Sequence, residues 1–127
     1  MEVGCGNGAL LRRVLDRCPE AEITGVDIKD LGLSLHPKIH FLEGQLERIA
    51  LPEGSFDVIY CSNLIEHVSD PLVFLARISA LLATNGRVIM VTPNHLSVDR
   101  FIFGRYWGAI IIRAILCYLA TAISGEL

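Results

Sequence analysis

The chain has 127 residues, a length that accommodates one domain built around a single hydrophobic core. Its formal net charge is −3 at pH 7 and it contains no Arg-rich run or basic stripe, so the composition argues against nucleic acid as a partner. The four cysteines form no C-x-x-C pair, which disfavours a zinc site and a disulfide framework. We therefore expect a protein of the reducing cytoplasm, with no metal and no signal peptide.

Short apolar runs alternate along the chain with segments of helical spacing. Residues 1–3 predict the end of a first strand, which leads through glycines into a helix over about residues 8–17. Val- and Ile-rich runs, typical of parallel strands buried on both faces, predict further strands at residues 21–28, 56–61 and 87–92, with a weaker one at 38–42. Residues 29–37 are too short and broken for a crossover helix, so a loop or a single turn is expected there.

A second helix is marked at both ends. Asp70 can cap its N-terminus and Pro71 suits its first position, while apolar residues recur at helical spacing over residues 72–82. The pair Asn85-Gly86 supplies a left-handed end before the next strand. This alternation of strands and helices predicts a doubly wound, mainly parallel α/β sheet.

The first nine residues hold a glycine-rich turn whose spacing fits two kinds of ligand. Gly4 and Gly6 with Ala9 fit the dinucleotide fingerprint, in which a tight turn presents a helix N-terminus to a pyrophosphate. The repeat Glu2-x-Gly4-x-Gly6-x-Gly8 favours another ligand, because the Glu2 carboxylate would repel a pyrophosphate in a partly desolvated cleft. A ligand with one carboxylate and a cationic centre suits an acid beside backbone N–H groups, and S-adenosylmethionine is such a ligand.

Asp27 ends the second predicted strand, nineteen residues after Gly8. A carboxylate at that position can accept hydrogen bonds from both hydroxyls of a ribose. The same feature serves NAD, so Asp27 supports a nucleoside ligand without choosing between the two.

Four longer motifs follow one another along the chain: E-V-G-C-G-N-G, I-T-G-V-D-I, L-P-E-G-S-F-D-V-I-Y-C-S-N-L-I-E-H-V-S-D-P and G-R-V-I-M-V-T-P-N. Together they resemble the class I S-adenosylmethionine-dependent methyltransferases, in particular the group that methylates small molecules. The resemblance covers residues 1 to about 107. It implies a Rossmann-like sheet of order 3-2-1-4-5 without the last two family strands, S-adenosylmethionine as cofactor, and methyl transfer to a small-molecule acceptor.

Carried over position by position, the resemblance implies a set of cofactor-binding residues. The methionine part would be held by Glu2, Gly4, Cys5, Gly6 and Gly8, and the ribose by Asp27 and Ile28. The adenine would be flanked by Gln45 and Leu46, and the region around the sulfonium would be lined by Ser62 and Asn63. Gln45 stands where the family usually has an aspartate, which alters the expected contact with the adenine amine.

His67, in the E-H-V turn, is the candidate general base, because an imidazole can take a proton from an acceptor hydroxyl near neutral pH. The alternative is a structural histidine that hydrogen-bonds a loop carbonyl. A general base is optional for methyl transfer, because the sulfonium is already a good leaving group. Orienting the two reactants can by itself lower the activation barrier by about 7–11 kcal/mol. Glu66 with His67 is a poor metal site by itself, and Ser62 lacks the G-x-S-x-G elbow of a hydrolase.

The resemblance stops after Trp107, so we divide the chain into a cofactor-binding core at residues 1–100 and a divergent, apolar, helical tail at residues 101–127. Within it, residues 107–123 carry Arg113 as their only charge. They fit either a membrane contact, or a helix folded back on sheet surface left bare by the missing strands, with Arg113 reaching outward. The short first strand and the unmatched apolar end are typical of a chain truncated at both ends.

Two other functions fit parts of the sequence. A non-catalytic interaction module would keep the fold and dock its tail onto a partner or a membrane. An NAD-dependent oxidoreductase would use the same turn and Asp27, although Glu2 opposes a pyrophosphate and no catalytic Tyr-Lys or His pair is recognisable.

Overall fold

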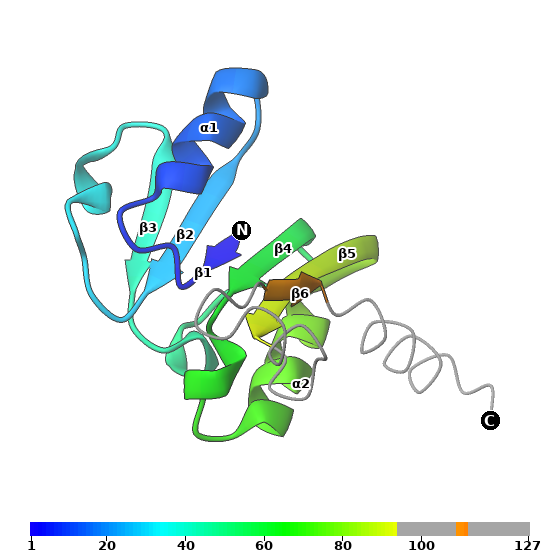
Figure 1. The fold of residues 1–127 in the computed structure, drawn as a ribbon. Helices are drawn as coiled ribbons and strands as arrows, with labels where there is room; N and C mark the ends of the chain where they lie inside the picture. Colours follow the sequence, from blue (N-terminus) through cyan, green and yellow to red (C-terminus); the bar gives the residue numbers. More distant parts are fainter. Residues whose placement is uncertain (94–108, 112–127) are drawn as a thin grey trace.

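The computed structural model of the chain describes residues 1–93 and 109–111, which form a sheet of six strands in the order β3-β2-β1-β4-β5-β6 (Figure 1). The strands are β1 (Glu2–Val3), β2 (Ile23–Asp27), β3 (Ile39–Glu43), β4 (Phe56–Ser62), β5 (Leu82–Pro93) and β6 (Ala109–Ile111). The first five pair in parallel, and β6 runs antiparallel to β5. The predicted order 3-2-1-4-5 is confirmed.

The first strand is short but central. It pairs with Gly25 and Val26 of β2 on one side and with Tyr60 and Cys61 of β4 on the other. The strand order reverses between β1 and β4, and the crevice beyond the carboxyl ends of the strands at such a switch point is where open α/β sheets bind ligands. The fold therefore places the glycine-rich turn, which follows β1 directly, at the expected binding position.

Two α-helices cover the sheet, α1 (Ala9–Arg17) and α2 (Pro71–Leu81). Leu11 and Leu15 of α1 are buried in a cluster with Ile23 of β2 and Ile39 of β3. Three single turns of 3-10 helix complete the elements: η1 (Leu33–Leu35), η2 (Leu46–Arg48) and η3 (Ile65–His67). The turn η1 confirms that no full helix forms between β2 and β3.

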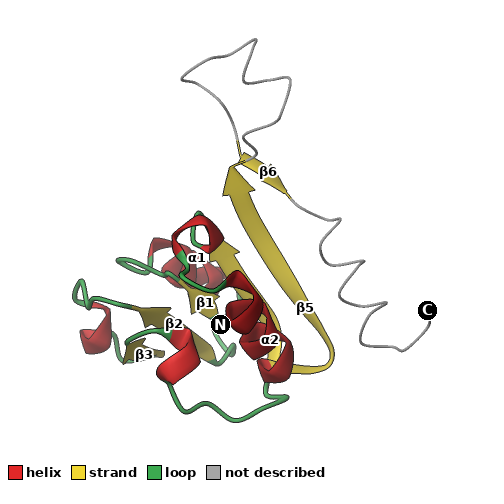
Figure 2. Ribbon diagram, turned by 90° about the horizontal axis from the view of Figure 1, so that it is seen from below, coloured by secondary structure: helices red, strands yellow, loops and turns green. Residues whose placement is uncertain are grey.

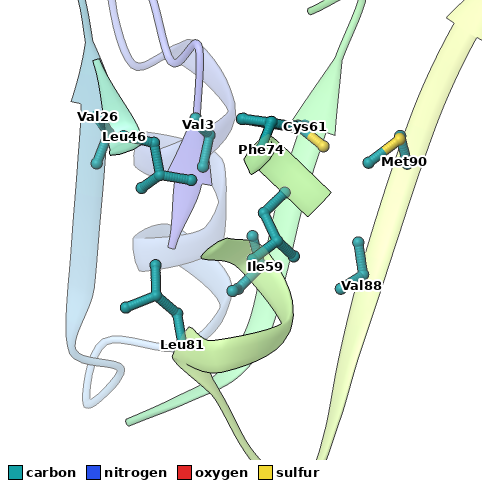
Figure 3. Close-up of a cluster of buried hydrophobic side chains, with 10 residues drawn as sticks. Val3, Val26, Leu46, Ile59, Cys61, Phe74, Leu81, Val88 and Met90 are labelled. Carbon is teal, nitrogen blue, oxygen red and sulfur yellow. The ribbon is translucent and has the colours of Figure 1, made fainter. Parts of the chain in front are cut away.

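The larger part of the core lies between α2 and the sheet (Figure 3). Phe74, Ile78 and Leu81 of α2 are almost fully buried there. The strands contribute Val3, Val26, Ile59, Cys61, Val88 and Met90 to the same cluster. Because successive residues of a strand point to opposite faces, Gly25 lies on the other face, where a Cβ added to it would approach the side chains of Cys5 and Leu11 to 2.9 Å. The two helices therefore pack on opposite faces of the sheet.

The start of α2 agrees with the sequence and its end does not. The Asp70 carboxylate accepts hydrogen bonds from the N–H groups of Leu72 and Val73, so the predicted cap is confirmed. The helix stops at Leu81, before Asn85-Gly86, because Leu82 already pairs with Phe56 of β4. Asn85 has the predicted left-handed φ, 66°, but lies within β5, where the pairing with β4 shifts register.

The predicted burial of the strands on both faces is wrong for β4 and β5. Val58 of β4 is 46% exposed and Ile89 of β5 is 43% exposed, although both belong to apolar runs. α1 packs with β2 and β3, and no described helix covers the same face of β4 and β5.

The C-terminal helix expected at residues 107–123 is wrong at Ala109–Ile111, which form β6. Figure 2 shows β6 at the far end of β5, where the two strands pair with Val91 opposite Ile111. An unpaired strand edge at β5 accounts for the pairing. The remainder of that segment and the boundary at residue 100 lie outside the described residues. Among the residues described, no helix has the length and apolar character needed to cross a membrane.

Candidate cofactor site at the switch point

The glycine-rich turn is tied closely to the end of β2. Gly4, Gly6 and Gly8 have φ of 74°, 53° and 71°, a left-handed backbone that favours glycine. A Cβ added at Gly8 would also lie 2.4 Å from Leu33 Cδ1, so a side chain is excluded there on both grounds. The Gly4 N–H donates to the Val26 carbonyl at 2.8 Å. The sequence therefore needs these glycines to fold the turn against β2 and η1.

Asp27 joins the turn through its side chain. Its Oδ2 accepts from the Gly6 N–H at 2.7 Å and its Oδ1 accepts from the Lys29 N–H at 3.3 Å. Each carboxylate oxygen has two lone pairs, so Asp27 keeps acceptor capacity for a ligand. The carboxylate predicted to bind a ribose is thus fixed beside the glycine-rich turn.

A cavity of about 610 Å³ opens at the carboxyl ends of β1, β2, β3 and β4. Small-molecule sites commonly occupy about 300–1,000 Å³. From the first half of the chain, the predicted site residues that line the cavity are Gly4, Asp27, Ile28, Gln45 and Leu46. The structure therefore brings together positions that are separated by up to forty-two residues in sequence (4 to 46).

The end of β4 and the connection after it form the facing wall. Ser62, Asn63 and His67, all predicted from the sequence, line the cavity there. Asn63 has a left-handed φ of 48°, and its N–H donates to the Val91 carbonyl of β5 at 2.8 Å. This hydrogen bond holds the start of the connection against β5.

The described lining of the cavity does not include Glu2, Cys5, Gly6 or Gly8. Cys5 is buried in the cluster beneath α1, and Gly6 contributes the N–H that holds Asp27. Gly8 packs its backbone against Leu33. These residues therefore support the conformation of the glycine-rich turn from outside the cavity lining. Their direct contact with a ligand stays a prediction.

Glu2 is a buried acid without a hydrogen-bond partner. Its side chain is 8% exposed, and its Oε2 has no partner among the described residues. Burial raises the pKa of Glu2 to about 7; the N-terminal ammonium opposes this shift and the Asp27 carboxylate adds to it. Val3 points into the cluster under α2, so Glu2 points to the opposite face, behind the turn.

Several residues that line the cavity could not be predicted as site residues from the sequence. Asp70, Val73 and Phe74 from the first turns of α2 form part of the wall, and their spacing predicts only a helix that packs on the sheet. Leu64 lies against the glycine-rich turn, where its Cδ1 would lie 3.4 Å from a Cβ added at Gly4. Arg48 of η2 adds a cation to the lining. Only the folded chain brings these residues to the glycine-rich turn.

The turn η3, which carries His67, is held to the sheet by its neighbour. Glu66 Oε2 accepts from the Thr92 hydroxyl at 3.1 Å, and Thr92 is 8% exposed at the end of β5. The backbone N–H of His67 donates to the Leu64 carbonyl at 2.9 Å, and the residue lines the cavity. The geometry is compatible with a base that faces an acceptor.

The two buried cysteines, Cys5 and Cys61, are not activated. Burial raises the pKa of the Cys5 thiol to about 12 and that of the Cys61 thiol to about 11, with nearby carboxylates adding to both shifts. Thiols of this kind stay protonated at neutral pH and are poor nucleophiles. Among the described residues, no three His, Cys, Asp or Glu side chains gather as a metal site would require.

Comparison with known families decides between the ligands that the sequence left open. The family described as "Methyltransferase domain" matches residues 1–90, which is more than half of the chain. The chain belongs to the class I S-adenosylmethionine-dependent methyltransferases. S-adenosylmethionine is accordingly the cofactor of its family, and the comparisons support neither an NAD-dependent oxidoreductase nor a non-catalytic module.

Relatives of this methyltransferase domain include two named enzymes. The ubiquinone biosynthesis O-methyltransferase of Stutzerimonas stutzeri is 31% identical over 104 residues, which cover 74% of this chain and 44% of that protein. The malonyl-[acyl-carrier protein] O-methyltransferase of Halalkalibacterium halodurans is 28% identical over 102 residues, covering 72% of this chain and 38% of that protein. The chain thus spans less than half the length of these relatives.

Solved structures share the fold of the methyltransferase domain. The plantazolicin methyltransferase BpumL, in complex with a desmethylPZN analog and SAH, matches with a TM-score of 0.70 and 21% identity, over 81% of this chain and 40% of its own. An S-adenosylmethionine-dependent methyltransferase from Mesorhizobium loti matches with a TM-score of 0.64 and 23% identity, over 73% of this chain and 45% of its own. Both likenesses confirm the Rossmann-like sheet.

Proposed function

We propose that this chain binds S-adenosylmethionine in the switch-point cavity and is the cofactor-binding part of an enzyme that methylates an oxygen atom of a small-molecule acceptor. The observation that carries the proposal is Asp27, whose carboxylate lines the cavity while the Gly6 N–H fixes it at 2.7 Å. Both named relatives are O-methyltransferases, which favours oxygen as the acceptor atom.

The residues of the cavity suit the parts of such a cofactor. Asp27 offers acceptors for two ribose hydroxyls, and the apolar side chains of Leu46, Val68 and Phe74 offer a surface for a planar base. Gln45 brings an amide oxygen in place of a carboxylate for the adenine amine. Behind the turn, Glu2 supplies negative charge that a bound cation would stabilise. The cavity therefore fits a nucleoside that carries a positive centre.

His67 is the residue we assign to proton transfer. A bound S-adenosylmethionine would supply the methyl group from its sulfonium, and the sulfur would keep the bonding electron pair as the leaving group. His67, a residue of the cavity lining, would accept the proton that an acceptor hydroxyl loses as its oxygen bonds to the methyl carbon. The hydrogen bond from the Thr92 hydroxyl to Glu66 ties η3, the turn that carries His67, to the end of β5, which supports this role.

The role of His67 is tested by methyl transfer from labelled S-adenosylmethionine to a panel of phenols and aliphatic alcohols. We predict that His67→Ala lowers kcat by about 10²–10⁴-fold, the usual contribution of a general base. The affinity for S-adenosylhomocysteine should stay unchanged, because His67 is not assigned to the cofactor. An unaltered kcat in His67→Ala would remove the residue from the reaction.

The choice of cofactor is tested by thermal unfolding of the full chain with either ligand. S-adenosylhomocysteine should raise the Tm in a concentration-dependent way, since a ligand that binds only the folded state stabilises it. NAD at the same concentrations should leave the Tm unchanged and should not weaken the effect of S-adenosylhomocysteine. Stabilisation by NAD alone would point instead to a dinucleotide site.

A further inference from the structure

Arg77 of α2 makes two hydrogen bonds to the connection between η2 and β4. Its Nη2 donates to the Ile49 carbonyl at 3.0 Å and to the Leu51 carbonyl at 3.2 Å. The side chain is half-buried, and the two carbonyls lie 28 and 26 residues before it in the sequence. The guanidinium therefore joins two parts of the chain that are distant in sequence.

These two parts are walls of the same cavity. Residues 45–48, which include η2, line it on one side, and Asp70, Val73 and Phe74 of the α2 region line it on the other. Arg77 does not line the cavity itself. It lies four positions after Val73 and three after Phe74, and residues at these spacings are neighbours on a helix surface. Arg77 is therefore one helical turn behind the α2 wall.

The turn η2 has little internal support. The Arg48 N–H donates to the Gln45 carbonyl at 2.9 Å, and the Ile49 N–H donates to the Leu46 carbonyl at 3.4 Å. Single turns of 3-10 helix have poor hydrogen-bond geometry. Leu46 is buried in the core cluster beneath α2 (Figure 3), but Gln45 and Arg48 are exposed. A restraint from outside the turn is needed to hold these two residues at the cavity.

The end of the same connection is anchored separately on α2. The Gly54 N–H donates to the Ala80 carbonyl at 2.9 Å, and the Ser55 N–H donates to the Leu81 carbonyl at 3.0 Å. These backbone bonds fix the chain where it enters β4. In the part of the chain that the structure describes, Arg77 makes the hydrogen bonds that join residues 47–53 to α2.

We propose that Arg77 is a positioning residue of the cofactor site, which holds η2 against α2 and so keeps the two cavity walls in place. The inference rests on the proposed function, because it concerns the same cavity. Arginine suits this role, since its guanidinium is planar, always charged and a rigid hydrogen-bond donor. A ligand that needs both walls binds in proportion to the fraction of molecules in which both are in place. Arg77 thus raises cofactor affinity without contact with the cofactor.

Isothermal titration of the full chain with S-adenosylhomocysteine tests the effect on affinity. Arg77→Met should bind about three- to tenfold more weakly, because η2 is then in place in a smaller fraction of molecules. Arg77→Lys should lie between Arg77→Met and the unmodified chain, since an ammonium restores a donor without the rigid guanidinium. Arg87→Met is the matched control. It removes the same charge at an exposed position of β5 outside the cavity lining and should bind as the unmodified chain does.

Hydrogen exchange without ligand separates positioning from general stability. The amides of Arg48 and Ile49 should exchange at least about threefold faster in Arg77→Met than in the unmodified chain, because local opening of η2 becomes easier. The amides of Gly54 and Ser55 should keep their protection, since they donate to backbone carbonyls of α2. Exchange that rises equally at both pairs of amides would mean that Arg77 contributes only to overall stability, and would overturn the proposal.

The titration distinguishes failure of this inference from failure of the proposed function. No binding by the folded, unmodified chain would refute the proposed function, and the role of Arg77 with it. Binding by the unmodified chain with equal affinity in Arg77→Met, or with no gain in Arg77→Lys over Arg77→Met, would refute the role of Arg77 alone. Circular dichroism establishes that each variant is folded. Should Arg77→Met not fold, an affinity of Arg77→Lys equal to that of the unmodified chain would overturn the proposal.

Discussion

At the scale of single residues, two carboxylates near the glycine-rich turn lie in contrasting surroundings. Asp27 is hydrogen-bonded through both oxygens and lines the cavity, whereas Glu2 is buried behind the turn with one oxygen unpartnered. The first arrangement suits a direct contact with a ligand. The second suits a charge that is costly in the free protein and is compensated when a cation binds nearby.

The buried acid predicts how stability changes with pH. Burial raises the pKa of Glu2 from 4.5 to about 7, so between those values the folded state holds a proton that the unfolded state has released. Stability therefore falls as pH rises through this window and the loss is complete above about pH 7. Glu2→Gln should remove the fall and stabilise the free protein by about 2 kcal/mol at pH 8.

Urea unfolding at pH 5 and pH 8 measures this effect. Glu53→Gln, which removes an exposed carboxylate in the turn before β4, is the control and should keep the pH dependence of the unmodified chain. An unchanged pH dependence in Glu2→Gln would show that Glu2 is charged in the folded state.

Sequence could predict the site residues whose function requires one particular amino-acid type. Gly4 and Asp27 lie at the cavity as expected, because a left-handed turn requires glycine and a strand-ending acid has few other uses at a switch point. Phe74 and Leu64 escaped prediction, since a leucine or phenylalanine at a cavity wall has the same sequence pattern as one in a core. Their role depends on packing between distant elements.

At the scale of elements, the two ends of α2 have different causes. A cap within the local sequence determines where the helix begins, and strand pairing with a distant residue determines where it ends. The Asp70 cap satisfies two N–H groups at the start of α2 without help from the rest of the chain. The end of α2 instead depends on the pairing of Leu82 with Phe56, a contact between residues twenty-six apart (82 − 56). Sequence therefore predicted the first boundary and misplaced the second.

The tail follows the same rule. An apolar run predicts a helix, but Ala109–Ile111 became a strand because the edge of β5 offered unpaired backbone groups. The exposure of Val58 and Ile89 among the described residues was also hidden from sequence. A strand that is covered on one face and a strand that is covered on both can have the same run of apolar residues.

The cap of α2 carries an element-scale prediction. Asp70→Ala should lower the free energy of unfolding by about 1 kcal/mol, since it leaves the Leu72 and Val73 N–H groups without their acceptor. Asp70→Asn should cost much less, because an asparagine oxygen caps equally well. Chemical denaturation compares the two variants. Equal losses would mean that the negative charge of Asp70 matters rather than its hydrogen bonds.

At the scale of the whole molecule, β1 joins two packing units into one binding site. One unit is the cluster of α1 with β2 and β3, and the other is the cluster of α2 with β4 and β5. The cavity lies at the carboxyl ends of the strands where these units meet, so its shape depends on both. The chain spans less than half the length of these relatives, and its described residues include the glycine-rich turn and the strand ends that surround the cavity.

The most direct measurement is isothermal titration of the full chain with S-adenosylhomocysteine. We predict saturable binding to the unmodified chain and to Asp57→Ala, whose exposed carboxylate lies in β4 outside the cavity lining. Asp27→Ala should bind at least about tenfold more weakly, because a hydrogen bond to a charged group contributes about 1.5–3 kcal/mol. Circular dichroism confirms that each variant is folded. No binding to the folded, unmodified chain, or equal affinity in Asp27→Ala, would contradict a cofactor site at the switch point.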